Sequence, residues 1–199
     1  MAQSYQRMLL SALLALTPLF SACERADDVS SITVDPMQAT IAFKPGDVKV
    51  VSRSTQGGGG YAVSDFVGRN NTATLEVGKY RLQVPRGAVR KPTRFMMVVL
   101  ENGLIGVRLY AWDRDWQPVR TFSTPLALTL PYDEADEAQI VAGAQLRIAN
   151  LVSESDPTVL ELVAAETDRI NQTVTGRLSH FSVWGLVIQF TKELSPGID

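Results

Sequence analysis

The tripeptide His180-Phe181-Ser182 is the part of the chain whose residue types could do chemistry on the chain itself. His180 is the only histidine in the sequence, and Ser182 follows two positions later. The Ser182 hydroxyl could attack the carbonyl carbon of Phe181 while His180 accepts the hydroxyl proton, since an imidazole titrates near neutral pH. This attack would break the Phe181–Ser182 amide bond, free the Ser182 amine and leave the Phe181 acyl group as an ester on the Ser182 hydroxyl. Water would then hydrolyse the ester and leave the chain cut between Phe181 and Ser182. Such a step also requires a strained peptide and a donor to the oxyanion.

The strand pattern around this tripeptide opposes self-cleavage. In a regular strand, His180 and Ser182 share one face while Phe181 points to the other, which holds the Ser182 hydroxyl away from the line of attack. We therefore expect Phe181 to be a core residue, with His180 and Ser182 making local hydrogen bonds. Self-cleavage is the alternative.

A second group of candidate residues is aromatic. Tyr110, Trp112 and Trp116 lie close together in the sequence beside Asp113 and Asp115. Aromatic rings next to carboxylates can form a platform for a sugar ring, so these three rings are a possible ligand platform. We expect instead that Tyr110 and Trp112, two apart on one strand face, pack into the core, and that residues 113–115 form a solvated turn.

Other catalytic and metal-binding patterns are missing from the sequence. The chain has one histidine and one cysteine, and it lacks the G-x-S-x-G and H-E-x-x-H motifs. The carboxylates of Asp133–Glu137 are concentrated in what we expect to be a solvated loop. We therefore predict no enzyme, no cofactor and no metal. The 19 Lys and Arg against 21 Asp and Glu give no reason to expect nucleic-acid binding.

Strands are the elements that must position these residues. Apolar and polar residues alternate in many short segments, and Asn102-Gly103 is a strong hairpin signal. No segment keeps a helical period over three turns. These features predict an all-β protein, an antiparallel β-sandwich. The predicted strands are 73–77, 79–84, 94–100, 106–112, 125–132, 144–151, 158–164 and 181–190.

The N-terminus has the pattern of a secretory signal peptide. Arg7 precedes an apolar run that ends at Phe20, and the small residues Ser21 and Ala22 lead to Cys23. This arrangement resembles the lipobox of bacterial lipoproteins, although Phe20 stands where that pattern prefers leucine. The resemblance implies that Cys23 is lipidated and that residues 1–22 are then removed, which leaves Cys23 as the first residue of the mature chain. A simple secreted protein or an uncleaved anchor is the alternative.

The lipobox resemblance also implies a location. A chain anchored through a lipid on Cys23 would be held at a membrane of the cell envelope, on the periplasmic or surface side. The residue after the cysteine is Glu24, not the aspartate associated with inner-membrane retention in some bacteria. We therefore favour the outer membrane.

Three motifs, in order along the chain, resemble the ZU5-like β-sandwich domains. They are "YRLQVPRGAV" (80–89), "FSTPLALTLPYDEADEAQ" (122–139) and "LELVAAETDRINQTVTGRLSHFSVWGLV" (160–187). The resemblance covers about residues 75–188. It implies an all-β module for protein interaction. Some proteins of this family cleave themselves at His-Phe-Ser, which would make His180 the base, Phe181 the acyl residue and Ser182 the nucleophile.

Together these patterns predict the organisation of the whole chain and its partners. The expected partner is an unidentified envelope protein, with a glycan as the alternative. Gly57–Gly60 predicts a mobile loop, because four glycines carry no packing side chain. The predicted segments are a signal peptide (1–22), a tether (23–30), N-terminal strands with the Gly-rich loop (31–60), a ZU5-like β-sandwich (61–190) and a tail (191–199).

Overall fold

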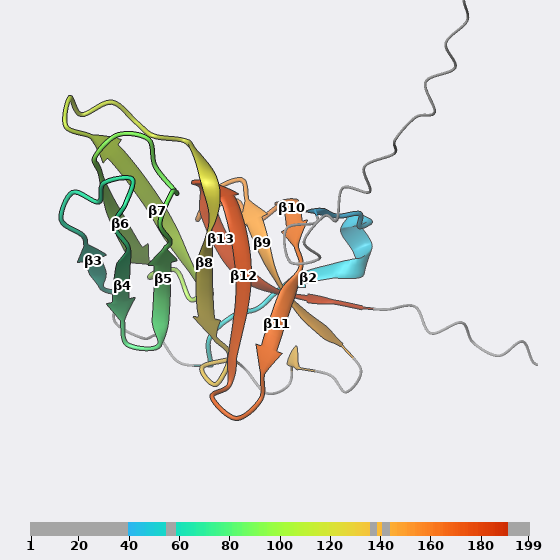
Figure 1. Ribbon diagram of the computed structural model, residues 1–199. Coiled ribbons are helices and arrows are strands. Elements are labelled where there is room, and N and C mark those ends of the chain that lie inside the picture. Colours follow the sequence, from blue (N-terminus) through green and yellow to red (C-terminus); the bar gives the residue numbers. More distant parts are fainter. Residues whose placement is uncertain (1–39, 55–58, 136–138, 141–143, 191–199) are drawn as a thin grey trace, which may run out of the picture. The chain divides into compact units, whose positions relative to one another are not determined.

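The fold is all-β, as the sequence predicts. The computed structural model describes residues 40–54, 59–135, 139–140 and 144–190 (Figure 1). Two antiparallel sheets pack against each other as a β-sandwich in this part of the chain. A 3-10 turn spans Pro45–Asp47. None of the described residues form a helix long and apolar enough to cross a bilayer. The signal segment, Cys23, the tether, Gly57, Gly58 and the tail lie outside the described residues.

The larger sheet contains eight strands in the order β1-β10-β9-β13-β7-β6-β3, with β2 paired to β13. All of its neighbouring strands are antiparallel. The strands are β1 (Thr40–Ile41), β2 (Val48–Val50), β3 (Tyr61–Val63), β6 (Thr93–Val99), β7 (Gly106–Asp113), β9 (Gln145–Leu151), β10 (Val159–Val163) and β13 (Val183–Gln189).

The smaller sheet contains five strands in the order β11-β12-β8-β5-β4. Its tightest hairpin joins β4 to β5 through Gly78 and Lys79. Gly78 has a φ of 58°, which fits the first central position of a type II′ turn, where glycine is preferred. The strands are β4 (Ala73–Val77), β5 (Tyr80–Val84), β8 (Thr121–Pro131), β11 (Ala165–Asp168) and β12 (Thr173–His180).

Several connections carry the chain from one sheet to the other, and two of them are made by only one or two residues (Figure 1). The step from β10 to β11 occurs at Ala164, and the step from β12 to β13 occurs at Phe181 and Ser182. The sequence predicts one continuous strand over 181–190, and this is wrong at its start. The regular ladder resumes only at Val183, because the chain bends there to enter the larger sheet.

Residues ahead of the predicted sandwich also belong to these sheets. β1 pairs with β10 and β2 pairs with β13. Just beyond β2, the Arg53 guanidinium donates to the Tyr80 hydroxyl at 2.7 Å and lies 3.1 Å from a Glu134 carboxylate oxygen. Tyr80 in turn donates to Glu134 at 3.0 Å, and burial raises the pKa of the Tyr80 hydroxyl above its usual value. These contacts fix the segment after β2 to the start of β5.

The larger sheet depends on a close approach of two backbones. Gly106 on β7 lies opposite Gly185 on β13, beside the fully buried Trp184. A Cβ atom added to Gly106 would lie 2.5 Å from the Trp184 carbonyl oxygen. Only glycine therefore allows β7 to pair with the central strand at this register.

We predict that Gly106→Ala destabilises the protein. The added methyl group must push β7 away from β13, and forced overpacking costs about 1–3 kcal/mol. The free energy of unfolding in urea measures this loss. Gly68→Ala is the matched control, because no heavy atom lies within 4 Å of a Cβ atom at Gly68. Equal stability of the two variants would contradict the close approach.

Candidate functional site

His180, on β12 of the smaller sheet, is engaged by a carboxylate from a strand of the larger sheet. Its Nε2 atom lies 2.7 Å from Oε2 of Glu161 on β10, and its ring packs on Trp184 with the ring centroids 5.1 Å apart. The other oxygen of Glu161 accepts a hydrogen bond from the Thr40 hydroxyl at 3.1 Å. The imidazole thus joins the end of β12 to β10 and, through Glu161, to β1.

Phe181 belongs to a cluster of three phenylalanine rings. Its ring centroid lies 5.7 Å from that of Phe95, in an edge-on geometry, and 4.6 Å from that of Phe122. Its amide donates to the carbonyl of Arg120 at 3.2 Å. The Phe181 side chain is therefore packed against the core where the chain changes sheet.

Ser182 lies at the bend itself, and its backbone is tied to β7. The Ser182 carbonyl accepts a hydrogen bond from the Leu109 amide at 3.1 Å. No hydrogen bond between the Ser182 hydroxyl and His180 occurs among the residues described. The regular strand ends at His180 and Ser182 lies at a bend, so the tripeptide lacks the alternating strand geometry that the sequence predicts. The structural interpretation of His180 is instead supported by its contact with Glu161.

The aromatic residues Tyr110 and Trp112 face away from the core, contrary to expectation. Leu109 and Ala111 are the residues of β7 that point inward, at 3% and 6% exposed. Tyr110 is 37% exposed, and Trp112 is half-buried beneath Trp116. The two indole rings are stacked, with centroids 5.8 Å apart and an interplanar angle of 16°. The structure therefore brings all three candidate platform residues to one outer surface.

The turn after β7 holds Trp116 in an unusual conformation. Trp116 is 70% exposed and has a φ of 60°, in the left-handed region. Asp113 stabilises this turn, because one of its carboxylate oxygens accepts the amides of Asp115 at 2.9 Å and Gln117 at 3.0 Å. Asp113 is 6% exposed, so it is a buried turn residue rather than a solvated one.

The outward side chains of β3, β6 and β7 form one continuous surface, which we call the aromatic face. The cross-strand partners are Tyr61 with Val98, Val63 with Met96, and Met96 with Tyr110. Tyr61 is 73% exposed and Val63 is 45% exposed. The face consists of Tyr61, Val63, Met96, Val98, Tyr110, Trp112 and Trp116.

Cations gather at the Trp116 end of the aromatic face. The guanidinium carbons of Arg94 and Arg114 lie 4.7 and 5.7 Å from the centre of the Phe66 ring. Arg94 is also the cross-strand partner of Trp112. Sequence reasoning missed this group, because its members come from three separate segments and no spacing rule relates them.

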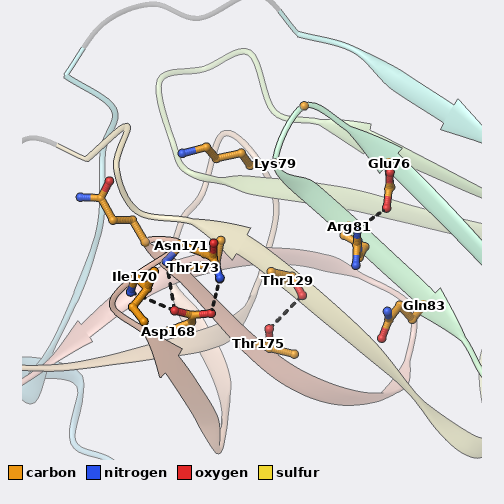
Figure 2. A pocket seen from close by; sticks show the side chains of 12 residues that line it. Glu76, Lys79, Arg81, Gln83, Thr129, Asp168, Ile170, Asn171, Thr173 and Thr175 are labelled. Atoms are coloured by element: carbon orange, nitrogen blue, oxygen red, sulfur yellow. Dashed lines mark hydrogen bonds and ion pairs between the residues drawn. The ribbon is translucent and has the colours of Figure 1, made fainter.

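A polar hollow of about 720 Å³ lies over the outer side of the smaller sheet (Figure 2). Its charged side chains already have partners: Arg81 pairs with Glu76 at 2.7 Å, and Lys79 pairs with Asp133. Asp168 accepts hydrogen bonds from the turn that ends in Asn171, and these lower its pKa. The charged side chains that line the hollow are therefore paired with other residues of the chain, and none of them is left without a partner for a ligand.

The described residues contain no group of three or more His, Cys, Asp or Glu side chains that could hold a metal ion. The geometry thus offers two sites of interest, the corner at His180-Phe181-Ser182 and the aromatic face. The corner contains a base held by a carboxylate. The aromatic face contains exposed rings with cations at one end.

We predict that the chain does not cleave itself. His180 is held by Glu161, and no hydrogen bond in the described part of the chain activates the Ser182 hydroxyl. Intact mass spectrometry of purified, denatured protein should therefore give one species that extends through residue 182. Two fragments that meet between Phe181 and Ser182, and that are absent in Ser182→Ala, would contradict this prediction.

Comparisons with known proteins do not assign the chain to a family. No protein-family model matches it, and a search of curated proteins finds no match. Any statement about its function therefore rests on its own residues and their geometry.

Proposed function

We propose that this chain is a bacterial cell-envelope lipoprotein that displays a non-catalytic, ZU5-like β-sandwich, and that its aromatic face binds a protein partner. One observation carries the proposal: the aromatic face leaves large apolar side chains in water. Among them, Tyr61 is 73% exposed and Trp116 is 70% exposed. A contiguous exposed apolar surface is typical of a binding site, because it is costly to leave solvated.

The composition of the aromatic face favours a protein as its partner. Tyrosine, tryptophan, methionine and arginine are enriched at protein interfaces, and this face contains all four types when Arg94 and Arg108 at its margin are included. Arg108 is held in place by Tyr110, to whose hydroxyl it donates at 3.2 Å. Such anchored aromatic and arginine side chains are the residues that dominate binding energy at interfaces.

The edge of the larger sheet gives a second reason for a protein partner. Among the described strands, β3 is hydrogen-bonded to β6 alone. The Gly60 carbonyl accepts from Val99 at 2.8 Å, and the Ser64 amide donates to Phe95 at 2.9 Å. In an antiparallel ladder, the backbone groups of the alternate residues Tyr61 and Val63 then point away from β6. An extended segment of a partner could pair with this edge beside the aromatic face.

The location at the envelope is supported by the N-terminal sequence. The apolar run before Cys23 and the small residues at the junction resemble a lipobox. The ZU5-like motifs agree with a role in protein interaction, and Glu24 favours the outer membrane. Self-processing at the His180 corner is the less supported alternative, because the imidazole already has a carboxylate partner.

A glycan is the second candidate partner, and the stacked indoles favour it. Trp112 covers one side of Trp116, so the other side of the exposed ring is free to stack on a flat ligand. This use would involve the Trp116 end of the face rather than Tyr61 and Val63.

Photo-crosslinking in cells tests the proposed function. A photoreactive phenylalanine analogue in place of Tyr61 should give a discrete protein adduct in the membrane fraction, because this position lies in the aromatic face. The same analogue in place of Ile170, which is 93% exposed on the turn between β11 and β12, is the matched control and should give none.

Two further variants separate the parts of the proposal. Val63→Asp should abolish the Tyr61 adduct, because a charge in the apolar face opposes burial. Cys23→Ser should remove the lipid from the N-terminal residue and leave residues 1–22 attached, which the intact mass of the chain measures. A Tyr61 adduct that survives Val63→Asp, or one that also forms from position 170, would rule out the aromatic face as the binding surface.

A further inference from the structure

The exposed ring of Trp116 is a rigid, flat surface. Trp112 lies parallel beneath it at 5.8 Å, and Asp113 fixes the turn through its two hydrogen bonds to backbone amides. A left-handed conformation costs a non-glycine residue about 1–2 kcal/mol. The fold therefore holds a large apolar ring in water at an energetic cost, in a position where only its outer side is available. A ring-shaped ligand can stack on that side without any rearrangement.

The surroundings of Trp116 are positively charged. Residues 86–94 and 112–120 contain six Arg and Lys and only two Asp, although the whole chain has a net charge of −2. We call three of these cations the cationic rim. Arg94 is the cross-strand partner of Trp112, Arg114 lies between the two tryptophans in the sequence, and Lys91 pairs with Asp113. Lys91 lies 3.8 Å from the Asp113 carboxylate, while Arg94 and Arg114 stack on Phe66.

The two arginines of the rim are held in place but not neutralised, whereas Lys91 is paired with Asp113. Stacking on the Phe66 ring orders the guanidinium groups of Arg94 and Arg114 and leaves their charge in place. No ion pair of either arginine occurs among the residues described. Arginine suits a carboxylate in particular, because its planar donors match the two carboxylate oxygens.

A hollow adjoins the cationic rim and extends the available surface. It has a volume of about 460 Å³ and is lined in part by Arg90, Lys91, Val119 and Thr121. Lys91 belongs to both the hollow and the rim. A ligand with more than one ring could therefore continue from Trp116 past Lys91 into this hollow.

From these observations we infer that the Trp116 end of the aromatic face binds an acidic saccharide, a pyranose unit that carries a carboxylate. The sugar ring stacks on Trp116, and the carboxylate lies against the cationic rim. A neutral sugar would leave the arginines without a counter-charge. The inference rests on the second candidate function given above and names its ligand class. Asp115 is the exposed acid beside Trp116 and opposes such a ligand.

A fluorescence titration with two matched probes tests the inference. The full chain, held in a polyoxyethylene detergent that contains no sugar, is titrated with trigalacturonate and with neutral galactotriose. The two probes differ by the carboxylate in place of a hydroxymethyl group on each ring. Trigalacturonate should change the tryptophan emission saturably, and galactotriose should bind about tenfold more weakly or worse, as expected for the loss of a charged hydrogen bond.

Variants assign the binding to the proposed residues. Trp116→Ala should remove trigalacturonate binding, and Trp116→Phe should retain part of it because a flat ring remains. Arg94→Gln and Arg114→Gln should each weaken it by about tenfold. Asp115→Asn should strengthen it, because the substitution removes a nearby negative charge. Higher salt should weaken it, since exposed charges are screened.

Several outcomes would overturn the inference. One is equal affinity for trigalacturonate and galactotriose, and another is undiminished affinity of Arg94→Gln and Arg114→Gln for trigalacturonate. A third is binding of the chain to anionic phospholipid vesicles or to an acidic peptide, without binding of trigalacturonate. Loss of the saccharide with a retained Tyr61 adduct would overturn this inference alone and leave the proposed function in place. Saccharide binding without that adduct would uphold the inference and remove the protein partner.

Discussion

The passage of the chain from the smaller sheet to the larger one at Phe181 and Ser182 is the constraint on which the sandwich depends. β12 and β13 are interior strands of their respective sheets, and two residues join them. Phe181 fills the corner by packing on Phe95 and Phe122, and His180 fixes its outer side by binding Glu161. A tripeptide whose residue types suggest chemistry thus has contacts that explain its presence structurally.

The same packing determines which side chains remain available to partners. Leu109 and Ala111 must point inward to meet the smaller sheet, so their neighbours Tyr110 and Trp112 must point outward. The aromatic face follows from this alternation of inward and outward side chains along β7. The turn held by Asp113 then adds the exposed indole of Trp116 to the face. A surface built from rigid strands in this way is preorganised for binding, which limits the entropy lost when a partner docks.

Local alternation was sufficient to predict the fold class and most strands, because a half-buried strand repeats every two residues. It could not reveal the corner, since Phe181, Ser182 and Val183 keep the apolar-polar alternation of a strand and nothing local marks a change of sheet. The sequence also left open which residues of β7 point inward, because Leu109 and Ala111 alternate with the equally apolar Tyr110 and Trp112. The His180 partner and the cations around Phe66 depend on strand pairing, which a single sequence does not encode locally.

We conclude that the His-Phe-Ser corner holds the two sheets together. Urea unfolding of Phe181→Ala and Ser182→Ala tests it most directly. We predict that Phe181→Ala lowers the free energy of unfolding by about 3 kcal/mol, as expected for loss of a packed phenylalanine. We expect Ser182→Ala to lower it by less than about 1 kcal/mol, because the contact of Ser182 with Leu109 involves its backbone carbonyl. A small effect of Phe181→Ala together with a large effect of Ser182→Ala would contradict the account.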